Sequence, residues 1–160
     1  MNTELENIKN SVETNSRTIE EIVDAIIQPY CEELDKYVDF IKSILSDGEN
    51  PPTAQELDDF CINLSTYIYY AGGMQERLGI KDGIARAIWK ETYHTHRDSI
   101  EKGTVAELAS QQEALISMAY KRAYGIMKMK VSAAQEILAS CKKIISRRMA
   151  ESELTRIGGN

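Results

Sequence analysis

The chain has 160 residues, of which 42% are hydrophobic, and this content is typical of a folded protein rather than a disordered one. Its apolar runs span only a few residues and its first residues are acidic, so we expect neither a transmembrane segment nor a secretory signal.

The net charge of −6 divides unevenly, because residues 1–60 carry 4 basic and 15 acidic side chains and residues 121–160 carry 9 basic and 3 acidic ones. This asymmetry predicts a C-terminal part that binds a polyanion or an acidic partner. The alternative is that acidic and basic parts pair within an oligomer.

The three cysteines, Cys31, Cys61 and Cys141, are widely spaced and odd in number. This usage predicts reduced, partly buried thiols in a cytoplasmic protein. No C-x-x-C pair is present, so we predict no zinc site of that kind.

The first part of the chain, residues 1–50, is expected to be an acidic helical segment. From Thr18 onward, apolar residues recur at helical spacing: Ile22, Ile26, Tyr30, Leu34, Val38, Ile41 and Leu45. Pro29 lies inside this series, and a proline in a helix interior either kinks the helix or divides it in two.

A turn is predicted at residues 47–52, which contain one glycine and two prolines. Thr53 and Glu56 then form a capping box, the signature of a helix start. We expect this helix to end at Leu78-Gly79. A third helical segment is expected from residue 82 to about residue 98, with Ile84 and Ile88 facing inward and Trp89 as a further inward candidate.

The last predicted element is one long helix. A second capping box begins at Thr104, no proline follows it, and we expect the helix to reach about Met149, with Leu154 as its outer limit. Forty-five residues span roughly 67 Å, which is long for a chain of this size. The sequence therefore predicts an all-α fold, a helical bundle or hairpin with one long C-terminal helix over about 104–150. Residues 53–157 form its main domain, and the protein is expected to oligomerise.

One side of this long helix is apolar. The residues expected to pack against other helices or another subunit lie close together at 100° per residue: Ile116, Ala123, Met127, Ala134, Leu138 and Ile145. Ile116, Met127 and Leu138 are eleven residues apart, and this period predicts a nearly straight or slightly right-handed stripe.

The opposite side of the same helix is basic. Five cations lie within about 60° of the direction opposite the apolar stripe: Lys121, Arg122, Lys128, Lys143 and Arg147. Glu136 is the only acidic residue among them. A basic ridge of this kind is typical of a protein that binds a phosphate backbone. The simpler alternative is that every amphipathic helix has a charged outer face, although such faces usually mix both signs.

A second candidate surface lies in the third segment. Cations alternate there with aromatic residues, a composition that suits a single strand whose bases stack while its phosphates are neutralised. The candidate contacts are Arg86, Lys90, Tyr93 and Arg97, with Trp89 and His94 beside them. The alternative is that Trp89 and Tyr93, one helical turn apart, belong to the core.

Catalytic chemistry is not predicted. Glu91 and His94 have the spacing of a di-iron ligand pair, but the chain holds no second pair to complete such a site. Two acidic pairs, in residues 32–35 and 56–59, faintly resemble the magnesium ligands of all-α nucleotide pyrophosphohydrolases, a family whose Glu-x-x-Glu element is missing here. We therefore expect a protein that is not an enzyme and needs no metal or cofactor.

From about residue 53 to residue 156, the order of features resembles the UvsY-like recombination mediators of bacteriophages. An amphipathic helix precedes a short cationic helix with Arg86, Lys90 and Tyr93, and a long helix follows that contains Ser146-Arg147-Arg148. The resemblance implies a cationic helix that contacts single-stranded DNA and a long helix that supports ring-like oligomers. It also implies a recombinase and a single-strand-binding protein as partners, and, for a protein of phage origin, the cytoplasm of the host cell as its location.

The sequence thus favours a DNA-binding protein that acts on single strands and assists recombinase loading. The first alternative is a helical structural or adaptor protein of phage origin that binds protein partners. The second alternative is the magnesium-dependent pyrophosphohydrolase.

Overall fold

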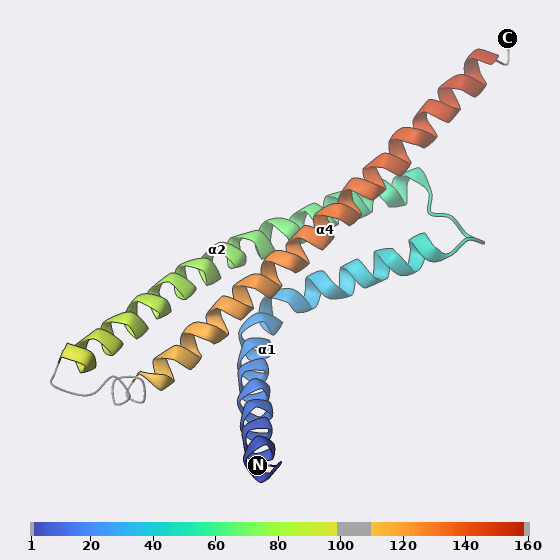
Figure 1. Ribbon diagram of the computed structural model, residues 1–160. Helices are drawn as coiled ribbons and strands as arrows, with labels where there is room; N and C mark the ends of the chain where they lie inside the picture. Colours follow the sequence, from blue (N-terminus) through green and yellow to red (C-terminus); the bar gives the residue numbers. More distant parts are fainter. Residues whose placement is uncertain (1, 99–109, 159–160) are drawn as a thin grey trace. The chain divides into compact units, whose positions relative to one another are not determined.

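The computed structural model describes residues 2–98 and 110–158, and within these ranges the chain forms helices and no strand. Helix α1 spans Asn2–Ser46, α2 spans Ala54–Asp98, and α4 spans Gln111–Gly158 (Figure 1). The predicted all-α fold is confirmed. The capping box predicted at Thr104 lies outside the described residues. Within the described part, no helix combines the length and the apolar character that crossing a membrane requires.

The long C-terminal helix is confirmed as a single element, and it extends further than expected. Helix α4 continues past both Met149 and Leu154 to Gly158. All side chains of residues 149–157 are exposed. No proline lies in this stretch, and the helix continues to Gly158.

The chain divides into two compact units, and each of the three helices contributes to both. Unit 1 comprises residues 1–29 and 75–127, and unit 2 comprises residues 30–74 and 128–160. These units do not coincide with the segments 1–50 and 53–157 expected from the sequence, because the long helices run through both units.

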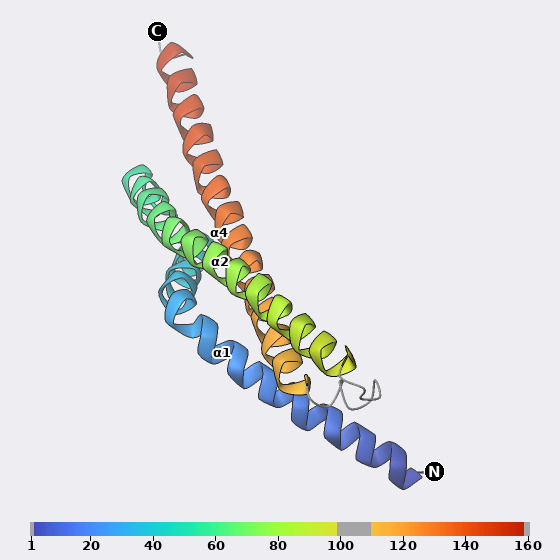
Figure 2. The ribbon, with the colours of Figure 1, turned by 90° about the vertical axis from the view of Figure 1, so that its left-hand side faces the viewer.

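Unit 2 is a packed three-helix arrangement (Figure 2). Helix α1 meets α2 through aromatic pairs: the rings of Tyr37 and Tyr67 lie 5.1 Å apart, and Phe40 and Phe60 meet edge to face at 5.8 Å. Such pairs stabilise beyond the area they bury. Fully or almost fully buried apolar side chains come from all three helices: Cys31, Leu34, Ile41, Leu57, Leu64, Ala71, Ala134 and Cys141.

Unit 1 is held by a smaller core. It buries Val23 and Ile27 of α1, Leu78 and Ala85 of α2, and Ala119, Ala123 and Met127 of α4. The alanines allow α4 to approach its neighbours closely, because they add little volume between the helix axes.

Helix α1 does not end at the proline in its interior. Pro29 lies within a continuous helix of 45 residues, so division, one of the two predicted outcomes, does not occur. Ile27 and Cys31 on either side of the proline are 6% and 2% exposed. Burial of these flanking side chains offsets the one backbone hydrogen bond that proline cannot donate.

The predicted helix end at Leu78-Gly79 is wrong, because α2 continues through it to Asp98. Leu78 is buried, and Gly79 lies against a ring of α4: a Cβ at Gly79 would be only 3.2 Å from Cε2 of Tyr124. This glycine therefore permits close packing of two helices rather than marking a stop.

The inward orientation predicted for Ile84 and Ile88 is also wrong. Their side chains are 55% and 49% exposed, and the inner positions are taken by Asp82 and Ala85 at 8% and 7%. A buried carboxylate is acceptable here because Arg86 Nη2 donates to Asp82 Oδ2 at 2.5 Å. Trp89, the third inward candidate, is half-buried.

The start of α2 is capped as predicted. The Thr53 backbone N–H and hydroxyl donate to Glu56 Oε2 at 2.7 and 2.8 Å, and the Glu56 N–H donates to Thr53 Oγ1 at 3.2 Å. The backbone and side-chain hydrogen bonds from Thr53 lower the pKa of Glu56.

Replacing the capping threonine is expected to destabilise the protein. Thr53→Ala leaves the backbone N–H of Glu56 without its acceptor, and such changes cost about 1 kcal/mol. Because the pKa of Glu56 is lower in the folded state, its contribution is present at neutral pH and is lost as the pH falls through the lowered pKa. Urea titrations of both proteins at pH 7 and pH 3 measure this. A stability difference that does not shrink at pH 3 would contradict the pH dependence.

Candidate nucleic-acid interface

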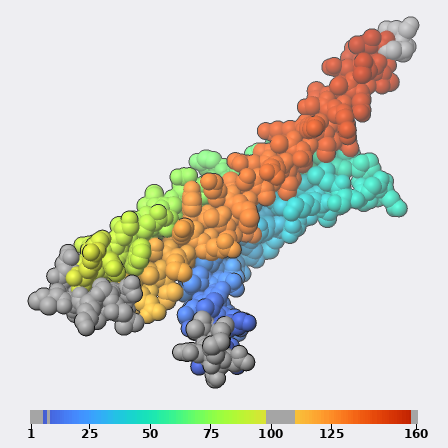
Figure 3. Space-filling view, viewed as in Figure 1, coloured from blue at the N-terminus to red at the C-terminus, as the bar shows by residue number. Residues whose placement is uncertain are grey.

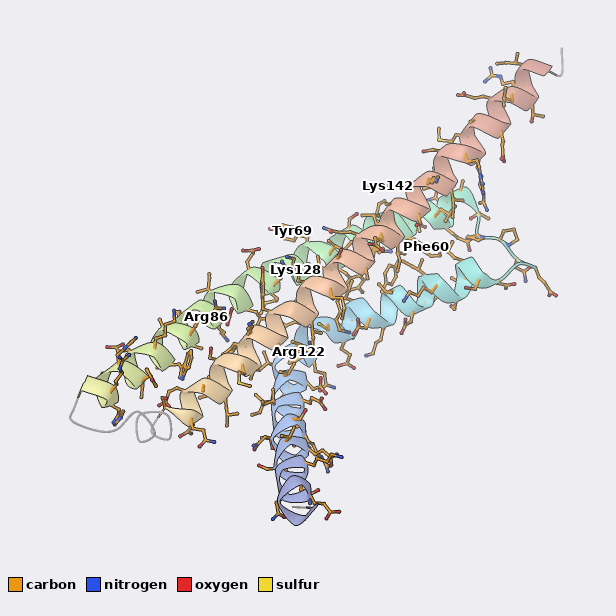
Figure 4. All side chains as sticks on the ribbon, in the orientation of Figure 1. Phe60, Tyr69, Arg86, Arg122, Lys128 and Lys142 are labelled. Carbon is orange, nitrogen blue, oxygen red and sulfur yellow. The ribbon has the colours of Figure 1, made fainter. Side chains whose placement is uncertain are left out.

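Helix α4 presents a buried side and a basic side. Ala123, Met127 and Ala134 are completely buried, so these predicted packing residues are used within the chain. Leu138 and Ile145 are half-buried, whereas Ile116 is 47% exposed. All five cations predicted on the opposite side are exposed: Lys121, Arg122, Lys128, Lys143 and Arg147. Arg122 and Lys128 are labelled in Figure 4.

The basic side chains of α4 fall into two groups. Lys130 is 29% exposed and pairs with Asp35 of α1, and Arg148 donates to the carbonyl oxygen of Pro52. Both contacts lie within unit 2. Within residues 2–98 and 110–158, the five outward cations form no ion pair, so their charges remain available to a ligand.

A further exposed cation of unit 2 was not singled out from the sequence. Lys142 is exposed on α4 and is labelled in Figure 4. The pKa of the nearby Cys61 thiol is raised by burial, an effect that the positive charge of Lys142 partly opposes. On a helical wheel Lys142 lies about 100° from the centre of the basic side, which is why the angular criterion excluded it.

In unit 1, two of the predicted cations line a surface groove of about 490 Å³. Lys121 and Arg122 of α4 share it with Met118 and with Ser16, Ile19 and Glu20 of α1. Gly125 also lines the groove, and nothing lies within 4 Å of where its Cβ would be. The groove combines two cations, one carboxylate and apolar walls, a composition suited to an anionic ligand with a flat apolar part.

The second predicted surface, on the last part of α2, is only partly assembled. Lys90 and Arg97 are exposed, but Arg86 already pairs with Asp82. Tyr93 is half-buried, and its ring meets that of His94 edge-on at 5.7 Å. Fewer cations and aromatic rings are therefore available to a ligand on this surface than the sequence predicted.

Two exposed aromatic residues were missed in the sequence. Tyr69 and Tyr70 of α2 are 77% and 67% exposed, and their rings contact each other edge to face at 5.6 Å. Residues 67–70 are all β-branched or aromatic, so the sequence pattern alone does not give the direction of each ring. The helical register shows that both rings point away from the core of unit 2.

The acidic pairs considered as magnesium ligands have other partners. Asp35 pairs with Lys130, and Glu56 accepts the hydrogen bonds of the α2 cap. Across the described ranges, no group of three or more histidine, cysteine or acidic residues could hold a metal ion.

Cys31, Cys61 and Cys141 form no disulfide and are buried, in agreement with the predicted reduced, partly buried thiols. Burial raises the pKa of Cys31, Cys61 and Cys141. We therefore expect all three to react with a thiol reagent on the order of tenfold or more slowly at pH 8 than in 6 M guanidinium, because the thiolate is the reactive form. Absorbance at 412 nm with Ellman's reagent measures this, and rapid reaction of the native protein would contradict it.

No protein-family model, curated protein sequence or solved structure matches this chain.

Proposed function

We propose that the protein binds single-stranded nucleic acid through the basic side of α4. The observation that carries this proposal is the exposure of five cations on one side of one helix, with Glu136 as the only carboxylate among them. Lysine and arginine on a helix surface neutralise phosphates and release counterions from the strand. Ala123 and Met127 are buried in unit 1 and Ala134 in unit 2, so within each unit the cations lie on the side of α4 opposite its buried residues.

A single strand is favoured over a duplex by two exposed apolar or aromatic surfaces, one of which lies beside cations. In unit 1 the groove joins Met118 to Lys121 and Arg122. In unit 2 two tyrosine rings are exposed on α2. Unstacked bases can stack on aromatic and apolar side chains, which paired bases inside a duplex cannot do. With the resemblance to UvsY-like proteins, we further propose single-stranded DNA as the ligand and a role in helping a recombinase to load.

The test is fluorescence anisotropy with a labelled 30-nucleotide single strand and the matching duplex, at 50 mM salt and with the fold verified by circular dichroism. The proposal predicts binding to both and tighter binding to the single strand. Absence of binding by the folded protein would overturn it. Equal affinity for both forms would overturn the preference for single strands.

A second candidate function is that of a helical adaptor that binds a protein partner, and it is favoured by an apolar pocket in unit 1. The pocket has a volume of about 240 Å³ and is lined mainly by Ile84, Ile88, Ile116 and Tyr120. Lys81 lies at its rim, with its Nζ 5.7 Å from the Tyr120 ring centroid. Such a pocket accepts an apolar side chain of a partner helix.

This pocket is expected to bind the apolar anionic dye 8-anilinonaphthalene-1-sulfonate in the native protein, with the sulfonate near Lys81. Dye fluorescence should increase with the native protein, and Ile116→Glu should abolish most of that increase. Ile157→Glu, which changes an exposed isoleucine elsewhere on α4, is the control. A native protein that leaves the dye fluorescence unchanged would count against the adaptor function.

A further inference from the structure

In unit 1 the last part of α2 and the first part of α4 run antiparallel. Gly79 of α2 lies against Tyr124 of α4, and Lys81 lies over the ring of Tyr120, with its Nζ 5.7 Å from the ring centroid. A step forward along α2 is thus matched by a step back along α4. Figure 1 shows the two segments side by side and in opposite directions. Side chains of both segments line the apolar pocket of about 240 Å³, and all of them belong to unit 1.

The two ends of this pocket carry opposite charges. Lys81 and Tyr120 form one end. Ile88 lies seven residues after Lys81 on α2, and Glu113 lies seven residues before Tyr120 on α4, so these two residues form the other end. Isoleucines and Ala85 line the floor between the ends. Seven residues of helix span roughly 10 Å, so a cation and a carboxylate lie at the two ends of an apolar surface of about that length.

One oxygen of the Glu113 carboxylate has no partner. Glu113 Oε2 is buried, and no group in the part of the chain that the structure describes forms a hydrogen bond with it. An acidic residue in the first turn of a helix interacts favourably with the helix dipole, but this interaction does not require burial. Leaving a buried acceptor without a donor is costly, and such acceptors are rare in folded proteins. We therefore expect a bound molecule to supply a donor at this end of the pocket.

The opposite end offers a cation that unit 1 does not neutralise. Lys81 is exposed, and it takes part in none of the ion pairs found among residues 2–98 and 110–158. Its contact with the face of the Tyr120 ring keeps the ammonium group at the rim of the pocket. This end is therefore suited to an acidic group of a bound molecule.

The floor of the pocket indicates what kind of molecule binds. Ile84, Ile88 and Ile116 are 55%, 49% and 47% exposed, so each has apolar surface that a partner can cover. The volume of about 240 Å³ lies below the range of about 300–1,000 Å³ that is usual for small-molecule pockets. It is large enough for one apolar side chain. A third helix packs readily along the groove between two antiparallel helices, so a partner helix is favoured over a free small molecule.

The charged ends give such a helix a direction. Two helical turns, about seven residues, span the distance between the ends. An acidic side chain of the partner then lies near Lys81 and a basic one near Glu113, with the apolar side chain one turn from each. Within a helix, acidic residues are favoured towards the N-terminus and basic residues towards the C-terminus. A partner helix that satisfies both conditions runs parallel to α2.

We propose that this pocket binds a partner helix that carries an acidic residue, an apolar residue one turn later and a basic residue one further turn later. The acidic residue lies near Lys81 and the basic residue donates to Glu113. This inference rests on the adaptor function, the second candidate above, and names the chemistry and the direction of the partner. It uses none of the five cations on the basic side of α4.

Two fluorescein-labelled, alanine-based helical peptides of about 16 residues test the proposal. The acid-first peptide carries glutamate, leucine and lysine at positions 5, 8 and 12, and the base-first peptide has the glutamate and the lysine exchanged. Fluorescence anisotropy at 50 mM salt measures both affinities. The acid-first peptide should bind about tenfold more tightly, because the exchange places like charges together at both ends of the pocket. The double variant Lys81→Glu with Glu113→Lys should prefer the base-first peptide.

Two further variants serve as controls. Lys36→Glu with Glu33→Lys exchanges two exposed charges on α1 in unit 2 and should leave the preference unchanged. Ile116→Glu should abolish binding of both peptides, and undiminished binding to it would overturn the proposal because the peptides would bind elsewhere. If the double variant at positions 81 and 113 fails to fold, Lys81→Gln and Glu113→Gln replace it. Each should reduce the preference about threefold, and a preference that neither changes would overturn the proposal.

The peptides and the dye separate this inference from the adaptor function. Equal affinity for the two peptides, or no binding of either at 500 µM, would overturn the proposed chemistry and direction. The adaptor function itself is decided by the dye measurement described above, which does not depend on the order of charges in a peptide.

Discussion

Replacing Lys143 and Arg147 of α4 with glutamate is expected to lower the affinity for a single-stranded oligonucleotide by about 25-fold or more at 0.1 M salt. Each phosphate contact on a single strand contributes about 0.7 to the slope of log K against log salt, so the loss of two contacts removes about 1.4 from that slope. Both side chains are exposed and lie outside the core of unit 2, so the helical content should not change. Anisotropy titrations at several salt concentrations measure affinity and slope together.

The matched control carries the same change of charge on another helix. Lys36 and Lys42 of α1 are exposed and lie beside carboxylates of their own helix, Glu32, Glu33 and Asp39. Glutamate at both positions changes the net charge by the same amount but should change the affinity much less. If this control weakens binding as strongly as the α4 variant, only the overall charge matters, and the assignment to the basic side of α4 is wrong.

Truncating Met127 to alanine is expected to destabilise the protein by about 2–5 kcal/mol, because it leaves a cavity between α4 and the helices it packs against. Met127 is completely buried, whereas Met129, two residues further along the same helix, is 64% exposed. In the space-filling view of Figure 3 the surface of α4 is coloured orange to red. Met129→Ala removes the same atoms and should cost only a few tenths of a kcal/mol, as surface changes usually do. Urea unfolding followed by circular dichroism compares the two. Equal effects would show that the buried side of α4 is assigned incorrectly.

The fold of α4 was predictable because its two sides are chemically distinct. Alanine and methionine recur at positions 123, 127 and 134 on one side and cations on the other, and both patterns have the helical period. The capped start at Thr53 was predictable because the capping box is a local signal that needs no tertiary contact.

The continuity of α1 and α2 was not predictable from local signals. Proline and glycine often interrupt helices, and whether Pro29 and Gly79 do so depends on the side chains that pack beside them. At Gly79 the decisive contact is the ring of Tyr124, which is 45 residues away in the sequence. Near Ile84 an inner position of α2 is taken by Asp82, whose carboxylate pairs with the half-exposed Arg86. Such contacts between distant or charged residues override the propensity of the local sequence.

The candidate interface was predictable in part. Burying an unpaired charge is costly, so the cations of α4 are expected on the exposed side of the helix. Their direction follows from the rotation of 100° per residue along a helix. The ion pair between Arg86 and Asp82 could not be predicted, because the charge pattern does not show which carboxylate a cation contacts. The exposure of Tyr69 and Tyr70 could not be predicted either, because it depends on how the helices pack.

The measurement that most directly tests the central proposal is the salt dependence of binding to a labelled single strand. With the five cations Lys121, Arg122, Lys128, Lys143 and Arg147 each contacting one phosphate, log K should fall with log salt with a slope of about −3.5. This corresponds to an affinity about 100-fold lower at 200 mM than at 50 mM salt. A slope near zero, or a folded protein that does not bind at 50 mM salt, would contradict the proposal that the basic side of α4 binds nucleic acid.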